Sequence, residues 1–267
     1  MNTNIKIAIL PLNIVTGNCE ANLMNVAEYL PQLSGNTDIL VLPELFSTGF
    51  IEDEQKLTNN NSSAAANITL ATLHLWSQRH NVAIAGSYLA RIGSKYVNRG
   101  FFIEPSGDET FYDKHHLFCL SKESSLYSAG ETHSPVIRFR GWNISLAICY
   151  DLRFPVWCRN QNQRYDILII PANWPQSRDY AWRHLLIARA IENQAIVVGA
   201  NRSGQDQLGT YGSSQIFDPL GKPLHIEENL NNQSPFIYAE YSHSQIDEIR
   251  KHLPVANDAD NFEIVQS

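Results

Sequence analysis

Short runs of apolar, often β-branched residues recur along the chain, and segments with helically spaced apolar positions separate them. Near-continuous apolar runs are typical of strands that are covered on one or both faces. Seven such runs predict strands at Ile5–Leu10, Ile39–Leu42, Val82–Ala85, Phe101–Glu104, Ile144–Ile148, Ile167–Ile170 and Ile196–Gly199.

Four of the separating segments have the apolar spacing of a helix. They predict helices at Glu20–Leu33, Ala65–Arg79, Asp179–Asn193 and Gln245–His252. In the third, apolar residues recur at helical spacing from Ala181 to Ile191. Ser177 is placed to cap this helix, and Asp179 falls in its first turn.

The alternation of strands and helices predicts an α/β layered fold. Two short links that contain glycine, Ala90–Ser94 and Pro219–Lys222, predict antiparallel hairpins. The polar stretch Asn59–Ala66 is expected to be a loop that enters a helix. Neither a repeat nor a shift in composition marks a boundary, so we predict a single domain over residues 1–267, with an acidic tail from about Leu253.

Composition narrows the class of protein. The 267 residues are 43% hydrophobic, which is enough for a sizeable core. The net charge is −7 with no basic stripe, so we expect no nucleic-acid partner. No apolar stretch approaches 18 residues, so we expect no membrane partner. The opening residues lack a secretory signal pattern and the four cysteines form no CxxC motif, so we expect a cytoplasmic protein.

Three segments place an ionisable residue at the end of an apolar run. They are Asp38-Ile-Leu-Val-Leu-Pro-Glu44, Phe111-Tyr-Asp-Lys114-His-His-Leu-Phe118 and Ser145-Leu-Ala-Ile-Cys149-Tyr-Asp-Leu-Arg-Phe-Pro155. In open α/β sheets, sites gather beyond the carboxyl ends of the strands. Glu44 and Cys149 are therefore able to converge, although 105 residues separate them.

A catalytic role for Cys149 requires help from neighbouring groups. A free thiol is mostly protonated at neutral pH, with a pKa of about 8.5. A nucleophilic thiol therefore needs a base and a positive charge, which Glu44 and Lys114 are able to supply. Each residue also has a structural interpretation when it is taken alone. Cys149 would be an inert buried thiol, Glu44 a carboxylate in a loop, and Lys114 a solvated charge at the surface.

Taken together in this order, the three segments resemble the Glu–Lys–Cys motifs of the nitrilase (carbon–nitrogen hydrolase) superfamily. Arg189-Ala-Ile-Glu-Asn193 and Tyr211-Gly-Ser-Ser214 resemble later signatures of that family. The resemblance implies a four-layer α-β-β-α sandwich, nitrilase-like, and a homodimer. It also implies that Glu123, seven residues before Gly130, is a second, auxiliary glutamate of the active site.

The resemblance further implies a mechanism. Glu44 accepts the thiol proton, Cys149 attacks an amide carbonyl, and Lys114 and the backbone N–H of Tyr150 hold the oxyanion. Glu44 then returns the proton to ammonia and activates water to hydrolyse the thioester. We expect no metal and no organic cofactor, because the chain has no phosphate loop, no HExxH motif and no Cys/His ligand spacing.

The cysteine motif is most similar to those of omega-amidases, whereas nitrilases proper usually have Cys-Trp-Glu there. This similarity implies hydrolysis of a small 2-oxo acid amide, such as 2-oxoglutaramate, a small-molecule substrate. Its carboxylate requires a cation, for which Arg153, Arg178 and Arg202 are candidates. Phe50 and Trp174 are either walls of the substrate pocket or core residues.

Several alternatives stay open at this point. Alternative substrates for the same fold are an N-carbamoyl amine, deaminated glutathione and a nitrile. The alternatives outside this chemistry are a binding protein without catalytic activity and, with less support, a thiol-redox protein. Ammonia release from a panel of amides, nitriles and carbamoyl compounds separates these alternatives.

The remaining histidines and cysteines receive structural interpretations. His115 and His116 are adjacent, so on an extended segment they point to opposite faces and do not share a metal ion. We expect His116 to make structural hydrogen bonds. Cys19, Cys119 and Cys158 are interpreted as unreactive packing residues.

Overall fold

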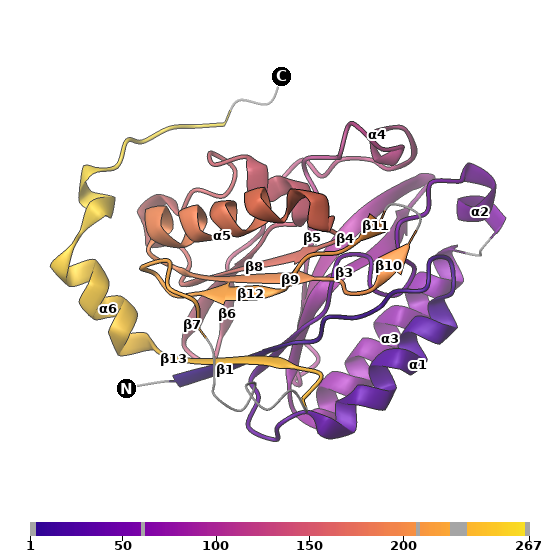
Figure 1. The fold of residues 1–267 in the computed structure, drawn as a ribbon, viewed down its shortest axis with the longest axis horizontal. Coiled ribbons are helices and arrows are strands. Elements are labelled where there is room, and N and C mark those ends of the chain that lie inside the picture. The colour runs from indigo at the N-terminus through magenta and orange to yellow at the C-terminus, as the bar shows by residue number, and fades with distance from the viewer. Residues whose placement is uncertain (1–3, 60–61, 207–208, 225–233, 265–267) are drawn as a thin grey trace.

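Two large β-sheets pack face to face, and helices cover their outer faces (Figure 1). The computed structural model describes residues 4–59, 62–206, 209–224 and 234–264. In the described residues one sheet has six strands in the order β13-β1-β2-β3-β4-β5, and the other has five in the order β12-β9-β8-β7-β6. The strands of the first sheet are β1 (Asn4–Ile9), β2 (Ile39–Val41), β3 (Ala83–Ile92), β4 (Lys95–Ile103), β5 (Glu109–Asp113) and β13 (Ile237–Ser242).

The second sheet consists of β6 (Ile137–Phe139), β7 (Trp142–Leu146), β8 (Ile167–Ala172), β9 (Ile196–Asn201) and β12 (Gln215–Phe217). A small ribbon pairs β10 (Gln205–Asp206) with β11 (Gly209–Thr210). The helices are α1 (Cys19–Tyr29), α2 (Glu54–Asn59), α3 (Ser62–His80), α4 (Glu123–Leu126), α5 (Asp179–Asn193) and α6 (His243–His252). None of the helices in the described ranges is long and apolar enough to cross a membrane.

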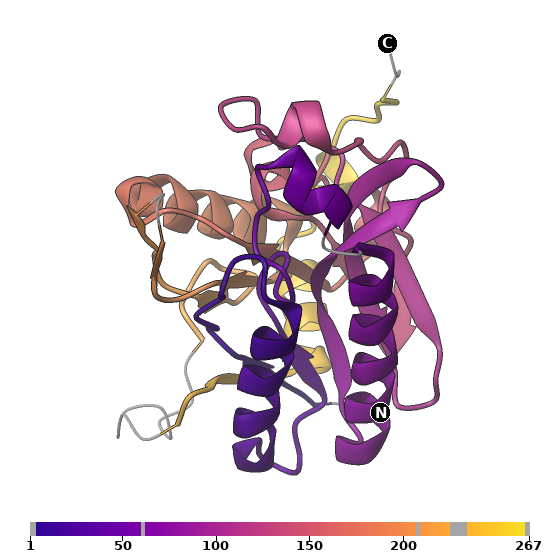
Figure 2. The same ribbon diagram turned by 90° about the vertical axis from the view of Figure 1, so that its right-hand side faces the viewer.

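The layers follow from the period-two alternation of apolar side chains along the strands. In β1, Ile7 and Ile9 belong to the core between the sheets, together with Ile144 and Ile167 of the second sheet. Ala8 points the other way, toward the core beneath α1 and α3. These two helices lie side by side on that outer face (Figure 2).

On the opposite outer face, α5 covers the second sheet. Trp182 and Leu186 of this helix pack against Leu168 and Val197 of β8 and β9. The protein is therefore a four-layer α-β-β-α sandwich, and the fold class predicted from the sequence is confirmed.

Parallel pairing brings the ends of distant strands together. β1, β2 and β3 pair in parallel in one sheet, and β7, β8 and β9 do so in the other. The chain leaves β2 toward Glu44, β7 toward Cys149 and β8 toward Asn173. All three residues therefore follow carboxyl ends of strands, as the sequence predicted for Glu44 and Cys149.

The seven predicted strands and four predicted helices are present, but the prediction missed others. β5, β6, β12 and β13 are short or carry polar residues between apolar ones, so they have no long apolar run. The link Ala90–Ser94 does join an antiparallel hairpin, between β3 and β4. Pro219–Lys222 is a tight turn, and in the described residues the pairing across it is one bridge between Phe217 and Pro223.

Two local predictions were wrong. The cap position of α5 is Arg178, with no capping side chain, because a 3₁₀ turn at Gln176–Arg178 leads directly into the helix, so Ser177 does not cap it. The stretch Asn59–Ala66 is not one loop, since Asn59 ends α2 and α3 already begins at Ser62; residues 60–61 lie outside the described residues. α6 ends at His252, directly before Leu253.

Candidate active site

Eight of the residues that the sequence singled out line one cavity of about 350 Å³. They are Glu44, Phe50, Lys114, Glu123, Cys149, Tyr150, Arg153 and Trp174. The cavity therefore joins segments that are more than 100 residues apart in the chain.

The centre of this cavity is a lysine held between two buried carboxylates. Lys114 Nζ donates to Glu44 Oε1 at 2.9 Å and to both oxygens of Glu123, at 2.8 and 3.0 Å. All three side chains are at most 3% exposed. Burial lowers the pKa of Lys114, but the two carboxylates and the thiol of Cys149 raise it, and the result is a pKa well above its usual range. The ammonium group therefore stays charged at neutral pH.

Glu123 also fixes the loop beside the lysine. Its Oε2 accepts a hydrogen bond from the backbone N–H of Phe118 at 2.7 Å. Burial raises the pKa of Glu123, the charge of Lys114 opposes this shift, and Glu44 adds to it. Both carboxylates therefore bond the same cation, Lys114. Glu123 also links this cation to the backbone of Phe118, which lines the cavity.

Two asparagines that the sequence did not single out orient Glu44. Asn98 Nδ2, from β4, donates to Glu44 Oε1 at 2.8 Å. The backbone N–H of Asn173 donates to Glu44 Oε2 at 2.8 Å, and Asn173 Nδ2 donates to the carbonyl oxygen of Glu44. Asn173 directly precedes Trp174, which the sequence had singled out, whereas Asn98 has no such neighbour.

Cys149 lies at the turn that follows β7. Its backbone has φ of 45°, in the left-handed region that non-glycine residues rarely occupy. Burial and the nearby Glu44 carboxylate raise the pKa of its thiol well above the usual value, while Lys114 and the backbone N–H of Asn173 oppose this shift. The free thiol is therefore protonated at neutral pH, and it needs a base to react.

A buried carboxylate holds the cysteine turn against the lysine segment. Asp151 Oδ2 accepts hydrogen bonds from Tyr112 Oη at 2.7 Å and from the backbone N–H of Ile148 at 2.9 Å. Its Oδ1 accepts from the backbone N–H and from Nδ1 of His116. No role was predicted for Asp151, although it is part of the cysteine motif.

The two adjacent histidines do not behave as their spacing suggested. Their rings lie 4.6 Å apart, so the expectation that they point to opposite faces was wrong, because the segment bends there. His116 does make structural hydrogen bonds, to Asp151, and His115 Nδ1 donates to the carbonyl of Gly130. Across the described part of the chain, no group of three or more His, Cys, Asp and Glu is arranged to hold a metal ion.

The candidate arginines separate into two kinds. Arg153 and Arg178 line the cavity, and so do Phe50 and Trp174. Arg202 does not: it is 1% exposed and is bonded to Asp206 and to the carbonyl of Ile14. It is therefore excluded as a substrate-binding cation.

The other cysteines occupy different environments. Cys158 is buried, and burial raises the pKa of its thiol to about 12. Cys19 is half-buried beside Thr69. Cys119 is exposed, so its interpretation as a packing residue was wrong.

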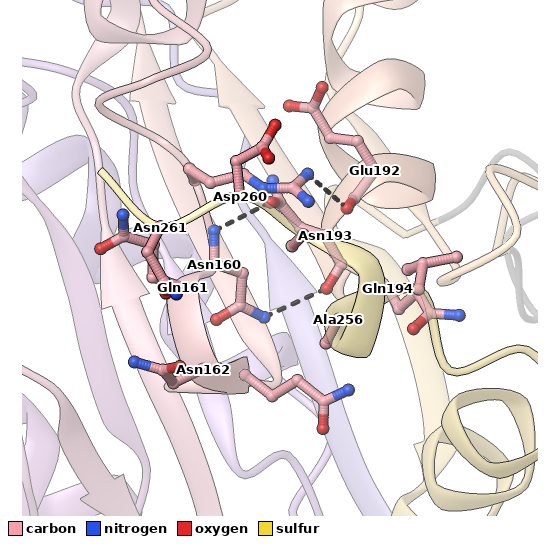
Figure 3. Close-up of a pocket in the computed structure, with 13 residues that line it drawn as sticks. Asn160, Gln161, Asn162, Glu192, Asn193, Gln194, Ala256, Asp260 and Asn261 are labelled. Carbon is pink, nitrogen blue, oxygen red and sulfur yellow. Dashed lines mark hydrogen bonds between the residues drawn. The ribbon is translucent and has the colours of Figure 1, made fainter.

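A second hollow at the C-terminal end of α5 contains none of the predicted site residues (Figure 3). Asn160 and Asn193 bond each other across it, through the backbone N–H of Asn160 to Asn193 Oδ1 and through Asn160 Nδ2 to the carbonyl of Asn193. Its volume of about 30 Å³ has room for one or two water molecules. We interpret this hollow as structural.

The main cavity contains the groups that acyl transfer through a thioester requires. These groups are a thiol, a buried carboxylate close to it and an ammonium ion that is able to stabilise a developing oxyanion. The layered fold and this chemistry define a class, that of hydrolases built on an α-β-β-α sandwich.

Comparison with known proteins identifies the family. The family model of carbon-nitrogen hydrolases matches residues 6–251, and the chain belongs to this family. Among curated relatives, it is 38% identical to omega-amidase YafV of Escherichia coli (strain K12) over 262 residues, which is 97% of this chain and 98% of the relative. It is 32% identical to 2-oxoglutaramate amidase of Bacillus subtilis (strain 168), over 94% of this chain and 96% of the relative.

Solved structures agree with this assignment. XC1258 from Xanthomonas campestris, a CN-hydrolase superfamily protein with an arsenic adduct in its active site, superimposes with a TM-score of 0.86 at 30% identity, over 98% of this chain and 100% of that one. Saccharomyces cerevisiae Nit3, of the nitrilase superfamily, has a TM-score of 0.81 at 22% identity, over 94% and 95% of the two chains. The second likeness concerns the fold alone.

Proposed function

We propose that the protein hydrolyses the amide of a small 2-oxo acid amide, such as 2-oxoglutaramate, to the carboxylate and ammonia. The arrangement of Lys114 between Glu44 and Glu123, in the cavity that Cys149 lines, is the observation that carries this proposal. The omega-amidase and the 2-oxoglutaramate amidase among the relatives support the substrate class. No cofactor takes part in the proposed reaction.

In the proposed first half-reaction, Glu44 takes the proton from the thiol while Cys149 Sγ attacks the amide carbon. The carbonyl becomes an oxyanion, which Lys114 Nζ and the backbone N–H of Tyr150 stabilise. Glu44 gives its proton to the amide nitrogen, the carbon–nitrogen bond breaks, and ammonia leaves. An acyl thioester on Cys149 remains.

The second half-reaction reverses these roles with water. Glu44 takes a proton from a water molecule, which attacks the thioester carbon, and the same two donors hold the second oxyanion. The carbon–sulfur bond then breaks, and the thiolate of Cys149 recovers the proton from Glu44. Glu123 keeps Lys114 in place throughout, and Phe50, Tyr150, Arg153 and Trp174 bind the rest of the substrate.

Ammonia release tests this proposal. Purified protein is mixed with 2-oxoglutaramate, glutamine, a nitrile, an N-carbamoyl amine and deaminated glutathione, side by side with the Cys149→Ala variant. We expect the highest kcat/KM for 2-oxoglutaramate and no turnover by the folded variant. A higher kcat/KM for another compound would reassign the substrate, and turnover by Cys149→Ala would reject the thiol as nucleophile.

We also propose that the protein is a homodimer that acts in the cytoplasm. Ile191, Leu220 and Leu253 are each about half exposed and line one shallow surface hollow beside the end of α5. Exposed apolar groups that gather in this way favour association with a second copy. The free state of all four cysteines agrees with a reducing compartment. Sedimentation of the wild-type protein and of Ile191→Asp tests the dimer, since the variant is expected to be monomeric.

A further inference from the structure

Arg153, which is exposed, and Arg178, which is half-buried, differ from most buried or half-buried arginines of this protein. Arg99, Arg189 and Arg250 each bond a carboxylate. In contrast, neither cavity arginine is bonded to a carboxylate within the described ranges, although both line the cavity that contains Cys149. A guanidinium beside a cavity that has no anionic partner of its own is available for an anionic ligand.

Aromatic rings hold both guanidinium groups in place. Arg153 lies over the ring of Trp174 at 4.9 Å, and Arg178 lies over the ring of Phe118 at 5.0 Å. The ring attracts the cation, and no hydrogen bond in the described ranges engages the N–H groups of either guanidinium. These N–H groups are the ones that bind a carboxylate with two parallel hydrogen bonds.

The two arginines belong to one connected wall. Trp174 Nε1 donates to the carbonyl of Arg178 at 2.9 Å, so the indole that stacks on Arg153 also fixes the backbone of Arg178. Phe118, the platform of Arg178, is bonded through its N–H to Glu123, which is bonded to Lys114. The arginine wall is therefore positioned on the same framework as the candidate catalytic groups.

Positive and negative side chains are distributed unequally between the two ends of the cavity. At the lysine end, Glu44 and Glu123 both bond Lys114, so this end has no free positive charge for an anion. The two arginines outweigh Glu52, the other acid in the lining. A molecule with a neutral amide at one end and a carboxylate at the other fits this polarity in one orientation only.

We infer that Arg178 and Arg153 together form a carboxylate subsite that orients the substrate and selects amides of acids over neutral amides. This inference rests on the proposed amidase function and adds the residues that determine the substrate class. Arg178 is placed on the 3₁₀ turn before α5, so its contribution comes from a segment that is separate from the cysteine motif of Arg153.

The test compares two primary amides of equal chain length, 2-oxoglutaramate and the neutral pentanamide. The ratio of their kcat/KM values is measured for wild type, Arg178→Gln, Arg178→Lys, Arg153→Gln and the control Arg183→Gln, an exposed arginine of α5. We expect the ratio to fall at least tenfold in Arg178→Gln and in Arg153→Gln, mainly through KM. Arg178→Lys should lie between them and wild type, because an ammonium keeps the charge but loses the two-point geometry.

A binding measurement separates this inference from the proposed function. The probe is 2-oxopentanoate, a monoanion without the amide, titrated calorimetrically into wild type, Arg178→Gln and Arg183→Gln. Binding at least tenfold weaker in Arg178→Gln alone supports the subsite, even if wild type hydrolyses neither amide and the proposed function fails. Equal affinities in the three proteins, or an unchanged ratio of kcat/KM, would overturn the subsite.

Discussion

Asp151 and His116 are bonded twice, since one carboxylate oxygen accepts both the backbone N–H of His116 at 2.9 Å and its ring Nδ1 at 2.8 Å. A carboxylate has no hydrogen to give, so Nδ1 must be the donor. The other oxygen holds the N–H of Ile148, the residue before Cys149. Asp151 is fully buried and connects the segment of Lys114 to the turn of Cys149, so it positions one relative to the other.

We therefore predict that Asp151→Asn lowers kcat about 10- to 100-fold with KM within about threefold, because a small misplacement of reacting groups has costs of this order. The matched control is Asp113→Asn. Asp113 directly precedes Lys114, and its carboxylate pairs with Arg99 rather than with the cysteine turn. Steady-state kinetics and circular dichroism are recorded for both. Equal effects of the two changes, or loss of kcat only in step with unfolding, would contradict the positioning role.

Lys114→Arg is expected to be nearly as damaging as loss of the lysine. The space between Glu44 and Glu123 fits a compact ammonium with hydrogen bonds of 2.8–3.0 Å, whereas a guanidinium is planar and larger. We predict a fall in kcat of about 10²- to 10³-fold, the usual effect of losing an oxyanion donor. Near-normal turnover in a folded Lys114→Arg protein would assign the lysine a structural role.

Glu44→Gln is predicted to lower turnover by at least about 10²- to 10⁴-fold, because glutamine keeps the shape of the side chain but cannot accept and return protons. Mass spectrometry after mixing with 2-oxoglutaramate shows which half-reaction fails. Unmodified Cys149 is the expected result, since the thiol itself needs the base. A stable thioester would instead restrict Glu44 to the water step, and free turnover would remove it from the mechanism.

Alkylation of Cys149 is predicted to be slow at neutral pH and to keep rising with pH into the alkaline range. Burial and Glu44 raise the pKa of this thiol, so its reactive thiolate is scarce at neutral pH. In Glu44→Gln, one cause of the raised pKa is removed, so the rise with pH should begin earlier. Rates with iodoacetamide from pH 6 to 10 are followed by mass spectrometry of the Cys149 peptide. A plateau already reached at pH 7 in wild type would contradict the raised pKa.

The convergence of the candidate site residues on one cavity was predictable because their motifs are local. Glu44, Lys114 and Cys149 each end an apolar run, and a strand that ends in this way places its last side chains at a sheet edge. Strands covered by other layers were also predictable from local sequence, because they are continuous apolar runs, as in β1 and β8. β13 was missed because Glu240 interrupts its apolar residues.

The supporting contacts were not predictable, because they join residues that sequence spacing does not relate. Asn98 reaches Glu44 across 54 positions and Asn173 reaches it across 129. The choice among the arginines depended on burial, since Arg202 differs from Arg178 in what already occupies its guanidinium. Likewise, the hydrogen-bonding capacity of Asp151 became visible only once four donors were found around it.

The hydrogen bonds of Glu44 leave it little freedom. A carboxylate has about four acceptor positions, and Lys114, Asn98 and the N–H of Asn173 occupy three of them. One acceptor position, on Oε2, remains open for a further hydrogen bond. In the proposed mechanism, the thiol, the departing ammonia and the incoming water therefore use this position one after another, so Glu44 activates water only after ammonia has left. Ammonia that stayed at this position would delay release of the acid product.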